Sequence, residues 1–552
     1  MNSDWFKSMS FYQIWIRSFK DGNGDGIGDL LGVYEKLSYI KSLGVDGIWF
    51  SPIYPSPNAD FGYDISDYKN IHPDYGTIED FKRVLDKAHE LGLKVIMDLV
   101  VNHTSDEHPW FIESKKSKDN PYSDYYIWRD AKAGKLPNNW DSLFEGKAWE
   151  YVPERDQYYL HIFAKKQPDL NMDNPKVREE VKSIMRFWLD MGVDGFREDV
   201  INFISKVEGL PNGLPFIPMA NGMPYYKDGP HLKEYLTEFR QVCEEYDCFL
   251  LGEGPMTTTD SALEYMAGEY PLLDMMFNFD HMMADCFITE YMHRPFDLRK
   301  LKKAFSKWQH TINGRAWNSL YIENHDHPRV LSRYGSEAFH RESGSMLAAS
   351  YLFQQGTPFI YQGQEIGMTN IRLKNINQYV DVSSVTNYHK FHIKDPVWKR
   401  MERIYHSSRD SSRTPVQWND SKNAGFTTGT PWFFVNDNYK KINVESEEKD
   451  PYSILNFYRR CLEYRKNSDV ILWGEYREFF KESKEFYMYE RNYLGDRVLV
   501  ICSFSKKTIH MPVPKEYRGR KLKLVLCNYP RVSRDDSKGY FRPYEARVYE
   551  VK

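Results

Sequence analysis

Short apolar segments alternate with segments of helical periodicity along most of this chain of 552 residues. The apolar segment 94–103 is almost unbroken, as expected for a parallel strand that is buried on both faces. Between such segments, apolar residues recur at intervals of three and four, as in Val177, Val181, Ile184 and Trp188. The predicted strands are eight in number: 11–19, 44–50, 94–103, 195–200, 249–253, 275–279, 319–326 and 358–363. This alternation predicts an α/β protein built as a (β/α)8 TIM barrel.

A doubly wound sheet is the alternative arrangement for alternating strands and helices. It requires a glycine-rich phosphate-binding turn after an early strand, and the sequence contains none. A short internal echo also favours a repeating barrel. The motif Gly-Val-Asp-Gly occurs at 44–47 and again at 192–195, each time between a helical pattern and a strand.

Two stretches break the alternation. Residues 104–174 are rich in aromatic residues and polar turns, which indicates a small subdomain inserted after the third strand. From about residue 477 the pattern changes to short alternating strands, which is typical of an antiparallel β domain. We therefore expect a catalytic barrel at 1–103 and 175–476, an inserted subdomain at 104–174 and a C-terminal β-sandwich domain at 477–552.

Composition excludes several classes of partner. The net charge is −4 and no block of Lys or Arg dominates, so no nucleic acid partner is expected. No apolar run reaches the ~18 residues that a membrane span needs, and the N-terminal residues show no signal-peptide pattern. The six cysteines are scattered without a CxxC pair. This predicts free thiols in a reducing compartment, and hence a cytoplasmic protein.

Charged side chains gather where the predicted strands end, and the active sites of TIM barrels lie at the carboxyl ends of the strands. Because an unpaired buried charge costs several kcal/mol, such a gathering indicates a functional site. The residues concerned are Asp98, Asn102 and His103 after the third strand, Arg197 and Asp199 after the fourth, Glu253 after the fifth, and His325 and Asp326 after the seventh.

Two of these carboxyl groups are suited to opposite roles. Strand alternation places Arg197 and Asp199 on one face and Glu198 on the other, toward the helices, where we expect a salt bridge or exposure. A neighbouring Arg197 should lower the pKa of Asp199, which suits a nucleophile. Glu253 follows an apolar run, so desolvation should raise its pKa into the range of an acid. One charged and one protonated carboxyl group are what glycoside hydrolysis requires.

Four motifs occur in the order DLVVNH, GFREDV, GEGP and ENHD. In this order and spacing they resemble the signature regions of glycoside hydrolase family 13, the α-amylase superfamily. Further segments narrow the resemblance to the oligo-1,6-glucosidase and α-glucosidase branch: DGNGDGIGDL, FGYDISDY, KKQPDLN, TPFIYQGQEIGM and SRDSSRTPVQW. The resemblance extends from about residue 11 to at least residue 480.

The resemblance implies a retaining mechanism with Asp199 as nucleophile, Glu253 as acid/base and Asp326 as the group that fixes the sugar hydroxyls. It also implies that His103, Arg197 and His325 bind the same glucose, and that Asp60 and Tyr63 close the pocket of an exo-acting enzyme. Phe163, Gln167 and Arg413 would then lie at its entrance.

Val200, directly after the expected nucleophile, resembles the residue of enzymes that cleave α-1,6 bonds. Relatives that prefer α-1,4 bonds more often carry Ala or Thr there. The alternative explanation is structural, because valine is also a favourable residue in a strand.

The segment 21–29 alternates acidic or amide side chains with glycines, a pattern that suits a hard cation. By resemblance, the ligands of a structural Ca²⁺ would be Asp21, Asn23, Asp25, Asp29 and the carbonyl group of Ile27. Mg²⁺ is the alternative ion, and a solvated acidic turn is the alternative without metal.

These observations predict an exo-acting α-glucosidase that releases α-1,6-linked glucose from isomaltose and isomalto-oligosaccharides. Sucrose, maltose and trehalose 6-phosphate are alternative substrates, and an inactive binding or transporter-associated relative is a further alternative. The stretch FNFDHMMADCF lacks the Arg-rich loop of sucrose isomerases, which favours hydrolysis over isomerisation. Glu198, Gly254, Pro255 and Glu323 depart from the commonest residues of the family. The expected partner is a small oligosaccharide, with the protein itself a monomer or weak homo-oligomer.

Overall fold

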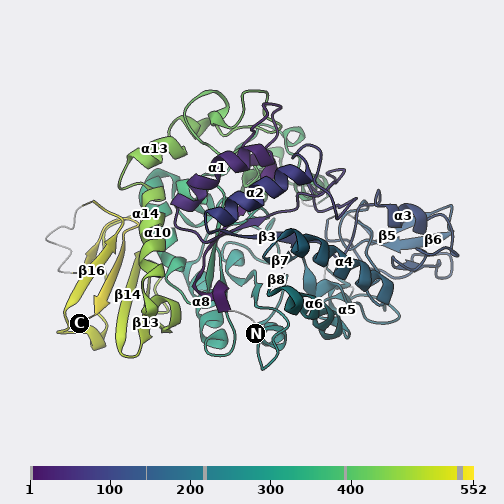
Figure 1. Ribbon diagram of the computed structural model, residues 1–552. Coiled ribbons are helices and arrows are strands. Elements are labelled where there is room, and N and C mark those ends of the chain that lie inside the picture. Colours follow the sequence, from purple (N-terminus) through teal and green to yellow (C-terminus); the bar gives the residue numbers. More distant parts are fainter. Residues whose placement is uncertain (1–3, 145, 215–219, 391–393, 531–538, 552) are drawn as a thin grey trace.

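The computed structural model describes residues 4–144, 146–214, 220–390, 394–530 and 539–551 (Figure 1). Its centre is a sheet of eight parallel strands in the order β10-β11-β1-β2-β3-β7-β8-β9. The strands are β1 (Phe11–Ile14), β2 (Gly47–Phe50), β3 (Lys94–Leu99), β7 (Gly195–Glu198), β8 (Phe249–Glu253), β9 (Met275–Phe277), β10 (Ser319–Leu320) and β11 (Thr357–Tyr361). The terminal strands β9 and β10 lie next to each other, so the sheet nearly closes into a barrel. All eight predicted strands are present, and the predicted (β/α)8 architecture is confirmed.

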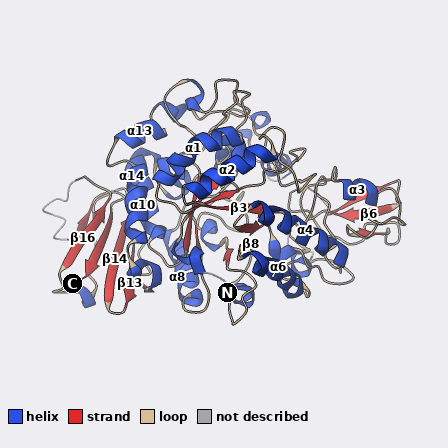
Figure 2. Ribbon diagram, viewed as in Figure 1, coloured by secondary structure: helices blue, strands red, loops and turns tan. Residues whose placement is uncertain are grey.

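Helices surround these strands, as Figure 2 shows. A capping box begins α2 (Ile78–Glu90), where Asp80 N–H donates to Thr77 Oγ1 at 3.2 Å and Thr77 N–H donates to Asp80 at 3.0 Å. The helix before β7 ends at Gly192 with φ of 107°, a left-handed conformation that favours glycine. Apart from α3 of the insertion, the α-helices up to β11 are α1 (Leu30–Ser42), α2 (Ile78–Glu90), α4 (Pro175–Met191), α5 (Met223–Tyr226), α6 (Leu232–Tyr246), α7 (Thr259–Met266), α8 (Leu298–Ile312), α9 (Val330–Tyr334) and α10 (His340–Leu352).

Further helices follow β11 and lead to the C-terminal sheet. They are α11 (Val382–Lys390), α12 (Val397–Ser407), α13 (Val444–Lys449), α14 (Ile454–Lys466) and α15 (Asp469–Trp473). Helix α14 packs against α10 on the outside of the barrel. No helix in the described part of the chain is long and apolar enough to cross a membrane.

The segment after β3 forms the expected insertion. It contains α3 (Pro109–Ser114) and an antiparallel sheet of β4 (Trp128–Arg129), β6 (Gln157–Leu160) and β5 (Trp149–Val152). Its apolar core, which includes Trp140, Trp149 and Phe163, is continuous with Val200 and Phe203 of the barrel. The insertion is therefore packed against the segment that directly follows β7, and it lies on the far side of the barrel from the C-terminal sheet (Figure 1).

The C-terminal strands form a five-stranded antiparallel sheet in the order β12-β13-β14-β18-β16. These are β12 (Glu475–Phe479), β13 (Phe486–Tyr493), β14 (Asp496–Ser503), β18 (Ala546–Val551) and β16 (Leu522–Cys527). One face shares the barrel core through α10. The other face is covered by the two-stranded ladder of β15 (Ile509–His510) and β17 (Tyr540–Phe541). The predicted sandwich thus has one five-stranded layer and one two-stranded layer.

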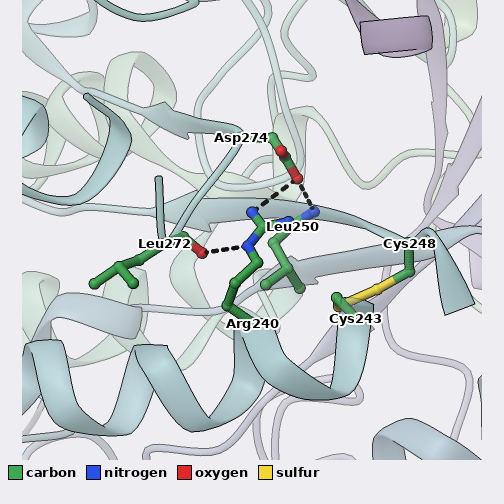
Figure 3. The surroundings of a disulfide bond; sticks show 6 residues. All are labelled: Arg240, Cys243, Cys248, Leu250, Leu272 and Asp274. Atoms are coloured by element: carbon green, nitrogen blue, oxygen red, sulfur yellow. Dashed lines mark hydrogen bonds and ion pairs between the residues drawn. A yellow bond between two sulfur atoms is a disulfide. The ribbon is translucent and has the colours of Figure 1, made fainter. Parts of the chain in front are cut away.

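The prediction that all six cysteines are free thiols is wrong for one pair. Cys243 in α6 and Cys248, just before β8, form a disulfide bond (Figure 3). Helix α6 ends at Asp247 in a left-handed conformation, and the chain turns back at once, which brings the two Cα atoms to 4.8 Å. Sequence spacing alone did not reveal this turn. The cysteines therefore do not support the predicted cytoplasmic location.

Glu198 lies on the outer face of β7, as strand alternation predicts, but the expected salt bridge or exposure is wrong. Its side chain is fully buried, and neither carboxyl oxygen has a hydrogen-bond partner among the residues that the structure describes. The nearby Arg240 instead pairs with Asp274 at 3.0 Å and donates to the carbonyl oxygen of Leu272 (Figure 3). Burial raises the pKa of Glu198 to about 8, although Arg240 opposes the rise. Glu198 is therefore protonated at neutral pH.

We expect Glu198→Gln to change how thermal stability depends on pH. Because the pKa of Glu198 is raised from 4.5 to about 8, the folded protein holds a proton that the unfolded chain loses in this window. Its contribution to stability is therefore present at low pH and is lost as pH rises toward 8. The Tm of Glu198→Gln, measured from pH 5 to pH 8, should fall less than that of the wild type.

The matched control is Glu264→Gln, which removes an exposed carboxylate that pairs with Lys233. Its pH dependence should follow the wild type. Parallel curves for Glu198→Gln and the wild type would contradict the assignment of a protonated Glu198.

Candidate active site

A cavity of about 360 Å³ opens at the carboxyl ends of the barrel strands, a volume that suits a small ligand. Asp199, Glu253 and Asp326, which are distant in sequence, all line it. Apolar side chains form much of the remaining wall, and the insertion contributes part of them: Leu143, Phe144, Phe163, Val200, Phe203, Met256, Phe279, Met283 and Ile288. Flat apolar walls with a few converging polar groups are typical of sites that bind sugars or similar compact ligands.

The guanidinium group of Arg197 is the centre of the polar network. It is fully buried and contacts Asp98 at 2.8 Å, Asp199 at 2.7 Å and Glu253. Asp98, Arg197 and Leu251 are paired across β3, β7 and β8, so the parallel register brings these groups together. Asp98 also accepts hydrogen bonds from Trp49 and from Tyr63. One cation thus holds three carboxyl groups from three neighbouring strands.

The two expected reactive carboxyl groups have raised pKa values. Burial raises the pKa of Glu253, as predicted, while Arg197 opposes the rise. Burial also raises the pKa of Asp199, and the neighbouring carboxyl groups Glu253 and Asp98 add to the rise. The prediction that Arg197 lowers the pKa of Asp199 is therefore wrong in its net direction. Desolvation and like charges outweigh a cation that is shared among three acids.

Asp326 differs from these two groups. Burial raises its pKa, but His325, Arg409 and Arg413 outweigh that effect and hold the pKa of Asp326 well below its ordinary value. Arg409 Nη1 lies 3.2 Å and Arg413 Nη2 lies 3.3 Å from Asp326 Oδ1. Asp326 therefore stays ionised to a lower pH than Asp199 and Glu253 do.

Val200 lies outside β7 in a left-handed backbone conformation, with φ of 37° and ψ of 40°. Such a conformation is strained for a β-branched residue, so strand preference does not explain the valine. This backbone turn lets Val200 N–H donate to Glu253 Oε2 at 3.2 Å, and the side chain lines the cavity. Val200 thus contacts both the cavity and one of its carboxyl groups.

The inner end of the cavity is closed by ion pairs. Arg409 Nη2 lies 2.9 Å from Asp60 and 2.7 Å from Asp381, while its Nη1 reaches Asp326. Gln167, a residue of the insertion, donates a hydrogen bond of 3.3 Å to Asp60. Asp60 has only 4% of its surface exposed, which shows how closely this end is sealed.

The predicted binding residues fall into two groups. Asp60, Tyr63, His103, Phe163 and Val200 line the cavity. The others lie behind its wall, where they are fully buried and support the lining groups: Gln167, Arg197, His325 and Arg413. His325, for example, contacts Tyr63 Oη at 2.6 Å and Asp326 at 3.1 Å.

The expected positions of Gln167 and Arg413 at the entrance are wrong. Gln167 is fully buried beside Asp60, and Arg413 is also fully buried. Its Nε donates to the carbonyl oxygen of His325 at 3.1 Å, beneath Asp326, and none of its side chain is exposed. Arg409, four residues earlier in the same SRDSSRTPVQW motif, lines the cavity instead. The motif indicated that an arginine lies at the cavity. Only the three-dimensional arrangement shows that this residue is Arg409 and not Arg413.

Residues 13–474 match the family of the alpha amylase catalytic domain. This chain belongs to the α-amylase family. It is 49% identical to the oligo-1,6-glucosidase of Parageobacillus thermoglucosidasius and 46% identical to that of Bacillus cereus, with both chains of each pair covered in full. It is also 43% identical to the trehalose-6-phosphate hydrolase of Bacillus subtilis, over 99% of this chain and 98% of the relative.

Crystal structures of two other members superpose on the whole chain. The trehalose-6-phosphate hydrolase of Bacillus licheniformis has a TM-score of 0.93 at 44% identity. The trehalulose synthase of Pseudomonas mesoacidophila MX-45 has a TM-score of 0.94 at 39% identity. In both pairs the match covers all of both chains. Proteins with different named activities thus share this fold, so the substrate must be argued from the cavity.

In this α-amylase family member, the candidate cation loop lies between β1 and α1. Asp21 accepts hydrogen bonds from the N–H groups of Gly24 at 2.6 Å and Gly26 at 2.8 Å, while Asp29 caps α1 through Gly32 N–H. The side chains of Asn23 and Asp25 bond to each other at 3.1 Å. The donor chemistry fits a hard cation. However, no cluster of three or more His, Cys, Asp or Glu side chains is arranged for a metal within the described residues.

Proposed function

We propose that this protein is an exo-acting, retaining α-glucosidase that hydrolyses terminal α-1,6-linked glucose from isomaltose and isomalto-oligosaccharides. The observation that carries the proposal is the meeting of Asp199, Glu253 and Asp326 in one cavity whose inner end is sealed over Asp60 and Arg409. A sealed end admits only the terminal sugar of a chain, which favours exo action. The oligo-1,6-glucosidases at 46–49% identity support the choice of reaction.

The reaction would proceed in two displacements at the anomeric carbon. Asp199, in the ionised form that Arg197 favours, attacks that carbon while Glu253 donates a proton to the departing glycosidic oxygen. Water then attacks the glucosyl–Asp199 ester, with Glu253 accepting its proton. Asp199 contacts Nη1 of Arg197 and Glu253 contacts Nη2. This arrangement favours the short distance between the two carboxyl groups that a retaining mechanism requires.

The remaining charged groups support the transition state. Asp326, ionised beside Arg409, would bind sugar hydroxyls and stabilise the positive charge that develops on the ring. Burial raises the pKa of Glu253, so this residue can hold its proton until the leaving oxygen takes it. When glucose enters, it displaces water from the site and strengthens these interactions.

The charge of the cavity favours a neutral substrate over a phosphorylated disaccharide. Its lining contains six acidic residues: Asp60, Asp199, Glu253, Asp280, Glu290 and Asp326. Among the described lining residues, Arg409 is the one Lys or Arg side chain, and three carboxylates already engage it. A dianionic phosphate would find no available cation there.

Asp199→Asn should abolish turnover of isomaltose and of p-nitrophenyl α-glucoside, because an amide cannot form the glucosyl ester. The loss should reach at least about a thousandfold, the scale seen when a nucleophile is removed. Thermal melting and circular dichroism should show a folded protein. Retention of wild-type kcat in this variant would reject the assignment.

A substrate panel tests the linkage preference. The ratio of kcat/KM for isomaltose to that for maltose should exceed one in the wild type and fall in Val200→Thr. A change of one methyl-sized group is worth ~1–3 kcal/mol, which corresponds to a fall of about fivefold or more. The panel also includes sucrose and trehalose 6-phosphate. Faster cleavage of maltose than of isomaltose by the wild type would overturn the α-1,6 proposal.

We also propose that the loop 21–29 binds a structural divalent cation, Ca²⁺ or Mg²⁺. The support is chemical: Asp21, Asn23, Asp25, Asp29 and the carbonyl oxygen of Ile27 offer five oxygen donors within one turn. Asp21 and Asp29 are buried, whereas Asn23 and Asp25 are exposed, so a cation would be held between the protein and the solvent. A bound cation would strengthen the junction between β1 and α1, away from the cavity.

Removal of the cation should lower stability. EDTA should reduce the Tm of the wild type, and Ca²⁺ should restore it, since a ligand that binds only the folded state stabilises it. Asp25→Asn, which removes an exposed ligand without disturbing the cap of α1, should abolish this response. An identical Tm with EDTA and with millimolar Ca²⁺ or Mg²⁺ would refute the metal site.

A further inference from the structure

A hairpin formed by residues 285–294 borders the cavity. Cys286 and His293 pair as an antiparallel bridge, and Arg294 N–H donates to the carbonyl oxygen of Asp285 at 2.7 Å. The base of the hairpin is anchored to α9, because Arg333 donates to both carboxyl oxygens of Asp285, at 3.0 Å and 2.6 Å. The hairpin is therefore a built element with a firm attachment to the barrel.

The tip of this hairpin lies at the mouth of the cavity. Ile288, Thr289, Glu290 and Tyr291 all line the cavity, and Ile288 is 57% exposed. On another part of the lining, Met256 is 61% exposed. By contrast, the residues at the inner end are almost fully covered. A sugar chain that enters with its terminal glucose first would therefore leave its next residue beside this tip.

Glu290 is held at the tip by His327, which directly follows Asp326. Glu290 Oε1 contacts His327 Nδ1, and Arg333 Nη1 lies 4.0 Å from the same oxygen. Oε2 has no hydrogen bond to any residue that the structure describes, so it remains available to a ligand. His327 is itself buried against the ring of Phe279, with ring centroids 5.5 Å apart. The contact with His327 thus orients the Glu290 carboxylate toward the part of the cavity where the departing sugar would lie.

We propose that Glu290, positioned by His327, binds the hydroxyl groups of the departing sugar and so determines which leaving groups the enzyme accepts. This inference rests on the proposed glucosidase function. It adds a residue that binds the departing sugar. A carboxylate oxygen accepts hydrogen bonds from sugar hydroxyls, and charge-assisted bonds of this kind are stronger than neutral ones. The exposed apolar side chains around Glu290 would cover the less polar face of the same sugar.

Two substrates separate leaving-group recognition from catalysis. Isomaltose carries hydroxyl groups on its leaving sugar, whereas the leaving group of p-nitrophenyl α-glucoside has none to donate. We expect Glu290→Gln to lower kcat/KM for isomaltose by about tenfold or more, the value of a hydrogen bond to a charged group. The kcat/KM for the nitrophenyl substrate should stay unchanged.

The role of His327 is tested by a conservative rescue. His327→Leu removes the donor to Glu290 and should reproduce the selective loss on isomaltose. His327→Gln retains an N–H donor and should recover most of the isomaltose rate. Met292→Leu, a change in the same hairpin away from the cavity lining, serves as the control and should leave both rates unchanged.

Three results would overturn the inference. These are no loss on isomaltose in Glu290→Gln, an equal loss on both substrates, or a selective loss in the Met292→Leu control. If the wild type cleaves another disaccharide better than isomaltose, that disaccharide takes its place in the comparison. Poor cleavage of isomaltose by the wild type would then refute the α-1,6 proposal without affecting the test of Glu290.

Discussion

The buried guanidinium of Arg197 is the interaction on which the site depends. It draws together Asp98, Asp199 and Glu253, three acids that would repel one another in a desolvated barrel. One cation does not balance the charge of three acids. Burial therefore raises the pKa of both Asp199 and Glu253, and Arg197 opposes the rise only in part. The shared cation thus keeps two carboxyl groups close together while protonation of either remains accessible.

A second cation, Arg409, organises the inner end of the cavity. It belongs to a segment between α12 and the C-terminal helices, yet it contacts Asp60 from the loop after β2 and Asp326 from the loop after β10. These pairings close the inner end of the cavity. The insertion and the hairpin 285–294 shape the other end, which stays open. The asymmetry between a sealed charged end and an open apolar end is what favours removal of terminal sugars.

Much of the fold and of the reactive centre could be predicted from local pattern. The apolar strands, and the acids that follow them, identified the barrel and the positions of Asp199, Glu253 and Asp326 because strand direction alone decides where strand ends meet. Other features depend on how distant segments pack. Glu198 lacks its expected partner because Asp274 occupies Arg240, and Glu290 reaches the cavity through a hairpin that follows no strand-end rule.

The sequence by itself determined the eight strands and the C-terminal sheet through the period of apolar residues. It determined the insertion through its aromatic residues and polar turns, and the set of acids at the barrel mouth through the strands that they follow. Only the tertiary structure decided that Arg409 rather than Arg413 lines the cavity, that Cys243 meets Cys248, and that the pKa of Asp199 rises. The physical reason is common to all three. Burial, charge pairing and the contact of two thiols depend on the summed surroundings of a side chain, and those surroundings come from segments far apart in the chain.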